Sequence, residues 1–195
     1  MPRANASRPA PGPRHRRHPA RPPRPLEARQ TVATLDRLSG GRVTLGAGLG
    51  GVPTEFTVFG QPMPSGAELD SCLSLVSRLL SGDEVRFTAD GPGVRLAPLP
   101  VQRPVPIWIG STSPAAARCA ERWGGWMIAG DDEQGRMAMA PDQVPDYSGE
   151  LALIGVSEPG SSVKDYTVSW WLEHLHGYRG TYDELLDRVR AGPPR

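Results

Sequence analysis

Residues 35–51 read Leu-Asp-Arg-Leu-Ser-Gly-Gly-Arg-Val-Thr-Leu-Gly-Ala-Gly-Leu-Gly-Gly, and this stretch decides the fold class. It reads as the end of a helix, a tight turn, a strand and a glycine-rich loop. Leu35 and Leu38 complete an apolar face on the expected helix that also includes Ala28 and Val32. Gly40 and Gly41 are expected to end that helix, because only glycine adopts the left-handed C-cap conformation at little cost.

The segment 42–45 is short and β-branched, which predicts a strand, and glycines follow it at once. Glycines just past a strand let a ligand approach the backbone closely. Gly46, Gly48 and Gly51 also fit the spacing of the dinucleotide-binding fingerprint, with Asp70 in a suitable place downstream. That motif needs a helix directly after the glycines, and the residues that follow break long helices, namely Pro53, Gly60, Pro62 and Pro64. We therefore set the Rossmann interpretation aside.

Beyond this stretch, short apolar segments alternate with helical ones. We expect strands over 43–46, 107–110, 126–129, 151–155 and 167–173. We expect helices over 26–38, 66–80 and 114–123, a last helix after Thr181, and a small hairpin over 85–88 and 94–96. This alternation predicts an α/β fold with a parallel sheet. A complete (β/α)8 barrel has eight strands and about 250 residues, so the expected strands predict a partial (β/α)8 TIM barrel.

The composition of the 195-residue chain allows one domain, or one and a part. A hydrophobic content of 38% permits a modest core, and 23 Gly with 22 Pro imply many loops. No apolar run approaches the length of a membrane span. Cys72 and Cys119 match no metal or redox spacing, and we expect buried free thiols on apolar helix faces. This usage fits a reducing cytoplasm.

Charge is unevenly spread along the chain. Residues 1–30 contain eight arginines and one acidic residue, which leaves 14 basic and 20 acidic residues in the remainder. Proline density in residues 1–24 prevents helix and strand, so we expect a disordered Pro/Arg-rich arm followed by a folded domain over 25–195. The acidic remainder has no general basic surface for nucleic acid, and nucleic-acid binding by the arm is the alternative.

One candidate site follows the apolar strand 107–110. Gly110, Ser111, Thr112 and Ser113 join this strand to a helix that begins at Pro114. A helix N-terminus with free N–H groups and neighbouring hydroxyls can bind phosphate. The alternative is an ordinary helix cap, with the Ser113 hydroxyl as N-cap and no ligand.

Other polar residues follow the later strands. Glu173 and His174 lie at a strand end, where either could handle protons. His174 and His176 could bind a metal on extended backbone, but two ligands without a nearby Cys or Asp are poor evidence, and we expect no metal site. The acidic stretch 131–133 is most simply a solvated loop. Trp170 and Trp171 are adjacent, so they should point to opposite faces of their strand.

Several motifs in this order resemble the bacterial luciferase-like family of flavin-dependent oxidoreductases. They are the quoted stretch over 35–50, Pro-Val-Gln-Arg-Pro-Val-Pro-Ile-Trp-Ile-Gly-Ser over 100–111, Gly-Gly-Trp-Met over 124–127, Ser-Trp-Trp-Leu-Glu over 169–173, Arg-Gly-Thr-Tyr-Asp-Glu-Leu-Leu over 179–186 and Arg-Ala-Gly-Pro-Pro over 190–194. The resemblance implies that the five strands are barrel strands four to eight, with the Pro/Arg-rich arm in place of strands one to three.

The resemblance also implies a function. It implies a monooxygenase or related oxidoreductase that holds reduced FMN, or alternatively the deazaflavin F420, at the carboxyl ends of the strands and acts on a small-molecule substrate. The flavin phosphate would lie at Gly110–Ser113, and Gly46, Ala47 and Gly48 would lie near the ring or phosphate. Leu49 stands where some relatives carry a phosphate-binding arginine, so that charged contact is missing.

The competing hypothesis is a truncated, inactive barrel remnant or an assembly component. Five parallel strands leave two open sheet edges, at 43–45 and 167–173, with unpaired backbone donors and acceptors. Their inward faces, including Leu45 and one of the two adjacent tryptophans, would then meet water. Such edges and apolar surface predict self-association.

Overall fold

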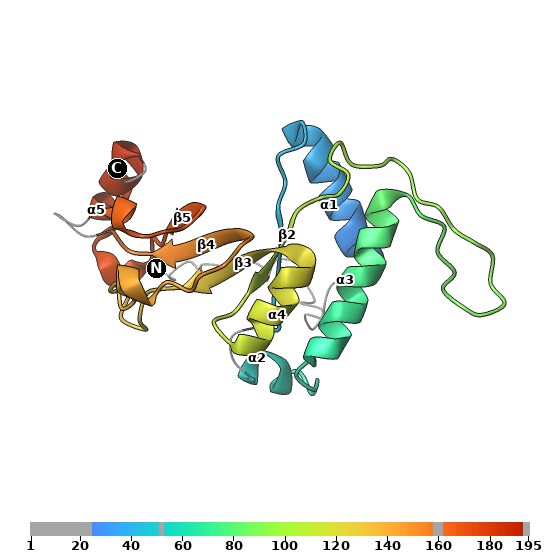
Figure 1. Ribbon diagram of the computed structural model, residues 1–195, viewed down its shortest axis with the longest axis horizontal. Helices are drawn as coiled ribbons and strands as arrows, with labels where there is room; N and C mark the ends of the chain where they lie inside the picture. Colours follow the sequence, from blue (N-terminus) through green and yellow to red (C-terminus); the bar gives the residue numbers. More distant parts are fainter. Residues whose placement is uncertain (1–24, 51–52, 158–161, 193–195) are drawn as a thin grey trace, which may run out of the picture.

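The computed structural model describes residues 25–50, 53–157 and 162–192, and the expected arm over 1–24 lies outside these residues. Five parallel strands form one sheet in the order β1-β2-β3-β4-β5 (Figure 1). The strands are β1 (Leu45–Ala47), β2 (Ile107–Gly110), β3 (Gly124–Ala129), β4 (Glu150–Gly155) and β5 (Trp170–Glu173). The expected α/β class with a parallel sheet is confirmed, while the correspondence with barrel strands four to eight stays a prediction.

In the described part of the chain, one α-helix precedes the first strand, three connect the first three strands, and one follows the last strand. The α-helices are α1 (Pro25–Ser39), α2 (Thr54–Thr57), α3 (Gly66–Ser81), α4 (Pro114–Trp123) and α5 (Tyr182–Ala191). Short 3-10 turns are η1 (Pro141–Gln143), η2 (Val163–Asp165) and η3 (Gly177–Arg179). The predicted hairpin is confirmed only as a single pair, because Val85 and Val94 form an isolated antiparallel bridge instead of a longer ladder. Across the described residues, every helix is too short or too polar to cross a bilayer.

Local sequence explains where the helices begin and end. The Ser65 hydroxyl accepts from the Glu68 N–H, and the Glu68 carboxylate accepts from the Ser65 N–H, which forms a capping box at the start of α3. Gly40 and Gly41 have φ of 68° and 85°, which confirms the expected left-handed end of α1. These signals lie within a few residues of the helix ends that they specify, so the helix ends could be predicted from sequence alone.

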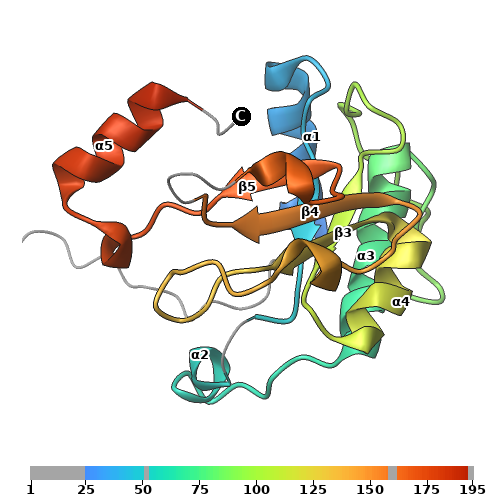
Figure 2. The same cartoon turned by 60° about the vertical axis from the view of Figure 1, so that its left-hand side comes forward.

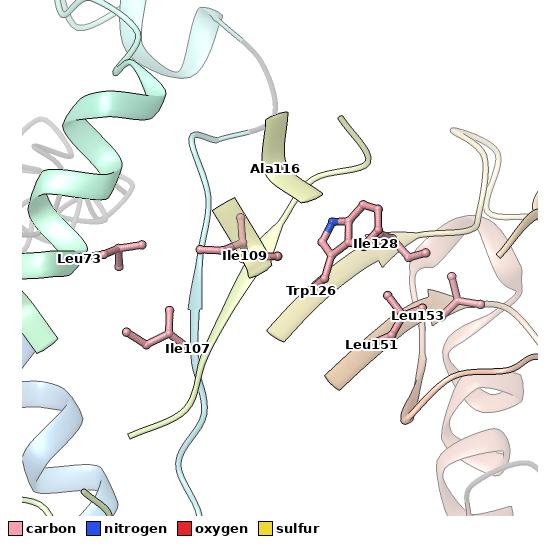
Figure 3. Packing of buried hydrophobic residues seen from close by; sticks show 9 residues of the cluster. Leu73, Ile107, Ile109, Ala116, Trp126, Ile128, Leu151 and Leu153 are labelled. Carbon is pink, nitrogen blue, oxygen red and sulfur yellow. The ribbon is translucent and has the colours of Figure 1, made fainter. Parts of the chain in front are cut away.

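The main core lies between the sheet and helices α3 and α4 (Figure 3). Alternate residues of the strands point to this face, because successive strand side chains point to opposite sides. The buried members are Leu73, Ile107, Ile109, Ala116, Ala120, Trp126, Ile128, Leu151 and Leu153. This layer holds the amino ends of α3 and α4 close to the carboxyl ends of β1 and β2.

Between β3 and β4 the chain takes an irregular path instead of forming an α-helix. Residues 130–149 include only the short turn η1. Four of their side chains pack on the edge of the main core, namely Met137, Met139, Val144 and Tyr147. The segment shows no helical periodicity, and burial of these apolar side chains holds it against the sheet in place of a connecting helix.

The opposite face of the sheet carries a pair of tryptophans. The Trp108 and Trp170 rings lie 5.9 Å apart, although they come from β2 and β5. Trp171 points the other way and packs against the main core, as expected for neighbouring strand residues. Trp170 is 51% exposed, whereas Leu45 packs on the core side, so the expectation that Leu45 would face water is wrong. β1 and β5 form the two edges of the sheet.

The buried face of α1 differs from the predicted one. Leu35 and Leu38 are 50% and 80% exposed, so they do not complete an apolar face. The helix buries Val32 and packs Ala28 against the core, as predicted, but it also buries its polar residues Arg29 and Asp36. α1 packs along α3 (Figures 1 and 2). Helical spacing alone could not distinguish these faces, because the polar one is buried by hydrogen bonding.

Asp36 binds the extended segment that leads into β2. Its carboxylate accepts from the N–H groups of Val101 and Gln102, at 2.6 and 2.9 Å. It also accepts from the Gln102 side-chain amide at 2.7 Å and lies 3.5 Å from the Val43 N–H. The Gln102 amide in turn donates to the Val43 carbonyl at 2.8 Å. One buried carboxylate thus ties α1, the approach to β1 and the approach to β2.

Arg29 makes a second set of bonds to the same segment. Its Nη2 donates to the carbonyls of Leu96 and Pro98, at 2.9 and 2.7 Å. Burial lowers the pKa of this guanidinium. Arg29 and Asp36 are two turns apart on α1, so one face of the helix binds both ends of residues 96–102.

We expect the substitution Asp36→Ala to lower the free energy of unfolding by about 3 kcal/mol, because the N–H groups of Val101 and Gln102 lose their acceptor inside the protein. Urea denaturation followed by circular dichroism measures this change. Asp90→Ala, in an exposed turn, is the control and should leave the midpoint unchanged. Equal midpoints for the two variants would contradict the role given to Asp36.

The same carboxylate should make stability depend on pH. Burial alone would raise the pKa of Asp36, but the hydrogen bonds from Gln102, Val101 and Val43 outweigh burial and hold it below its ordinary value. The stabilisation is therefore complete above the unfolded pKa of about 3.9 and is lost as pH falls through the lower folded pKa. In urea titrations repeated across pH, the free energy of unfolding of Asp36→Ala should fall less at acidic pH than that of the wild type.

Candidate functional site

The glycine-rich loops after β1 and β2 meet at the carboxyl edge of the sheet. β1 and β2 pair with Ala47 opposite Ile109, so the two loops leave the sheet side by side. A Cβ at Gly48 would lie 3.2 Å from the carbonyl oxygen of Gly110, closer than nearly all Cβ contacts. Glycine at position 48 therefore allows the two strand ends to lie in close contact side by side.

The loop after β2 forms a well-defined cap on α4. The Ser113 hydroxyl accepts from the Ala116 N–H at 3.2 Å, as predicted for an N-cap followed by proline. The Ser111 hydroxyl accepts from the Ser113 N–H at 3.1 Å, and the Ser111 carbonyl accepts from the Trp126 indole at 2.7 Å. Ser111, Thr112 and Ser113 are all exposed. The cap is complete, and its hydroxyls remain accessible.

A cavity of about 500 Å³ lies beside this cap, between the amino-terminal half of α3 and the helix α4. Gly48, Gly110, Ser111 and Ser113 line it, together with Arg118 and Arg122 from α4. Arg122 is ion-paired with Asp70 of α3, and Arg118 is exposed at the cavity wall. Sequence reasoning missed both arginines, although their spacing of four residues places them on one face of a helix.

A second cavity, of about 820 Å³, is lined by two of the other residues predicted for the cofactor site. Gly46 and Ala47 line it, and Gly48 lies between the two cavities. Its other walls are apolar residues of α1 and α3, including Leu26, Leu73 and Val76. Thr112 lines neither cavity. The structure thus brings Gly48, Gly110, Ser111 and Ser113 together and places Gly46, Ala47 and Thr112 outside that group.

Each cavity also contains one cysteine. Cys119 lines the smaller cavity and Cys72 the larger one. Both thiols are free, as expected, but each is half-buried instead of buried. Burial raises the pKa of each thiol. Neither is therefore a ready nucleophile near neutral pH.

Glu173, at the end of β5, is surrounded by hydrogen-bond donors. Its carboxylate accepts from the Trp171 indole at 2.8 Å and from the Ser157 hydroxyl at 3.0 Å. Arg179 and Arg188 lie at 2.8 and 3.1 Å. Burial alone would raise the pKa of this carboxyl, but the hydrogen bonds, first among them that from Trp171, hold it below its ordinary value. Glu173 is thus an ionised acceptor that anchors the chain after β4 and the helix α5.

Asp131 and His174 meet at the carboxyl edge between β3 and β5. His174 Nδ1 lies 2.6 Å from the Asp131 carboxylate, and the Asp131 side chain is only 8% exposed. The prediction of a solvated loop at Asp131 is therefore wrong. An isolated bridge between Asp131 and Met137 folds the segment back toward the sheet and buries the carboxylate. The His174 and His176 rings lie 4.6 Å apart beside it.

The sequence is also similar to known proteins. The sequence model described as luciferase-like monooxygenase matches residues 18–152. An uncharacterised protein of Mycobacterium tuberculosis is 38% identical over 118 residues, which cover 58% of this chain and 40% of that protein. A protein of Microbacterium testaceum named F420-dependent glucose-6-phosphate dehydrogenase is 33% identical over 175 residues, covering 85% of this chain and 48% of its own length.

A similar structure has also been solved. A monooxygenase from Streptomyces bottropensis, RslO1, aligns with a TM-score of 0.48 and 28% identity over 66% of this chain and 44% of its own. The chain spans less than half the length of each of these three proteins.

Glu173→Gln should lower the free energy of unfolding by about 2–4 kcal/mol, because Arg179 and Arg188 would lose a partly buried anionic partner. Asp187→Asn is a matched control, since Asp187 pairs with Arg190 in solvent with side chains 75% and 68% exposed, and it should have no measurable effect. Thermal and urea unfolding measure both variants. A Glu173→Gln protein as stable as the control would show that the cluster is not an anchor.

Proposed function

We propose that this chain, which belongs to the luciferase-like monooxygenase family, contributes to an oxidoreductase that holds reduced FMN or F420 at the carboxyl edge of its sheet. One observation carries the proposal. Gly48 lies beside Gly110 where the paired strands β1 and β2 end, next to the amino end of α4, and both glycines line a cavity with accessible hydroxyls and arginines. This arrangement suits the phosphate of a flavin-type cofactor.

The residues present fit a phosphate group in three respects. Gly48 and Gly110 both line the cavity, and the absence of side chains at these two positions leaves their backbone available to a ligand there. The positive end of the α4 dipole lies at Ser113. Arg118 adds a positive charge to the wall of the same cavity and can supply the contact that Leu49 does not. Ser111, Ser113 and Arg118 are therefore the residues that we propose hold the phosphate.

The identity of the cofactor is supported only at the level of the class. Two relatives at 33% identity, from Amycolatopsis mediterranei and Microbacterium testaceum, are named F420-dependent glucose-6-phosphate dehydrogenases. When bound, either cofactor supplies the electron-transfer chemistry, and the protein positions it and excludes competing reactions. We propose a small organic molecule as the substrate, and the name of these relatives makes a sugar phosphate the first compound to test.

A second candidate function is that of an assembly component, which the sheet edges favour. β1 and β5 each pair with one neighbour only among the described strands. Trp170, on edge strand β5, is 51% exposed, and the apolar cavity of about 820 Å³ adjoins the other edge. We propose that the chain associates with itself through these edges, since paired edges would satisfy the free backbone groups.

The cofactor proposal is tested by titrating the full chain separately with FMN and with F420 while following fluorescence. Arg118→Ala should raise the dissociation constant about tenfold, because a charge-assisted hydrogen bond is lost. Arg86→Ala removes an exposed arginine that lines neither cavity and should not change the affinity. No binding of either cofactor, or the same affinity in both variants, would rule the proposal out.

Self-association is tested by sedimentation velocity at several concentrations. We expect the full chain to sediment as a dimer or larger species, and Trp170→Glu to shift it toward the monomer by placing a charge on the exposed edge. Tyr182→Glu is the control, because Tyr182 is 78% exposed and belongs to α5, not to an edge strand. A wild-type chain that stays monomeric throughout the series would refute this arrangement.

A further inference from the structure

The side chains of Asp131, His174 and His176 converge at the carboxyl edge of the sheet. One ligand-type atom from each lies within 4.8 Å of the other two. Asp131 comes from the segment after β3, and the histidines come from the segment after β5. The sequence places the histidines together but leaves Asp131 some forty residues away, which is why the third group escaped sequence analysis.

The backbone around this cluster is held in place by its own hydrogen bonds. The Asp132 carboxylate accepts from the N–H groups of Gln134 and Arg136, both at 2.9 Å, which fixes the turn that carries Asp131. Gly135 is buried in this turn with φ of 70°, and the imidazole of His176 occupies the space that a Cβ would take. The turn after β3 and the histidine segment after β5 are thus fitted to each other.

The charges around the cluster leave Asp131 available to a cation. Arg136 pairs with Asp132, and Arg179 pairs with Glu173, so these two arginines of the adjoining segments already have anionic partners. The Asp131 carboxylate, with its side chain 8% exposed, contacts His174. Burial of a carboxylate away from water favours a bound cation or a charged hydrogen-bond donor.

We propose that Asp131, His174 and His176 bind a divalent transition-metal ion of the kind that prefers imidazole and carboxylate ligands, such as Zn²⁺. Two histidines and one carboxylate form a recognised ligand set for such ions, and three protein ligands leave a coordination position open. The ion would replace the proton shared between His174 Nδ1 and Asp131, whose 2.6 Å separation must widen slightly to admit it. The site is distinct from the cavity proposed for the cofactor phosphate.

The alternative is a simple His174–Asp131 hydrogen bond without metal, and the two are separable by experiment. The chain contains four histidines, of which His15 and His18 lie in residues 1–24. Untagged full-length protein would be titrated with Zn²⁺ by calorimetry, and with Co²⁺ by visible absorption, whose intensity reports the coordination geometry. We expect one Zn²⁺ per chain.

Variants then locate the site. Asp131→Asn keeps the size of the side chain and should weaken Zn²⁺ binding at least tenfold, while His176→Ala should abolish it. The control, His15→Ala with His18→Ala, should bind like the wild type. Circular dichroism confirms that each variant is folded, and Asp131→Asn remains informative if His176→Ala does not fold.

Two results would overturn the metal site. One is no Zn²⁺ or Co²⁺ binding by the wild type, which leaves only the hydrogen bond. The other is binding that survives Asp131→Asn but is lost when His15 and His18 are replaced. FMN and F420 titrations of the same variants should match the wild type, because none of these residues lines the cofactor cavity, so failure of either proposal is recognised separately.

Discussion

The buried carboxylate of Asp36 is the interaction on which the arrangement of the amino-terminal part depends. It fixes the extended segment that delivers β2, and β2 stands next to β1 in the sheet. Because a buried carboxylate is tolerated only when its hydrogen bonds are supplied, the positions of α1 and of residues 101–102 are coupled. The exposed Leu35 and Leu38 follow from this choice, since the helix face that carries Asp36 is the one that turns inward.

The carboxyl edge of the sheet concentrates the polar chemistry of the molecule. Parallel strands direct all their following segments to one edge, so Gly48, Ser111, Asp131 and His174 lie along the same border although they are far apart in sequence. Groups suited to an anion and groups suited to a cation occupy different parts of this border. Loop backbone and a helix amino end lie after β1 and β2, and imidazoles with carboxylates lie after β3 and β5. The division supports separate ligands at the two ends.

Local signals made part of this structure predictable. Capping residues such as Ser65 and Ser113, and the apolar strand 107–110, specify elements through contacts with near neighbours in sequence. The loops at Gly48 and Gly110 could be placed at one edge because each follows a strand of a predicted parallel sheet. What depends on distant partners was missed: Asp36 is inward because Gln102 lies opposite, Asp131 is buried because its segment folds back, and Arg118 joins the site only when α3 and α4 pack together.

The order of strands in the sheet has a consequence for how the chain acquires its structure. Each strand lies beside the one that precedes it in sequence, from β1 to β5. The sheet can therefore be extended one strand at a time from its amino-terminal end, without waiting for a later segment to be inserted between earlier ones. Contacts between neighbouring units close shorter loops than insertions would, which favours rapid folding. On the ribosome, such a chain can begin to order its first strands and helices while β5 is still being synthesised.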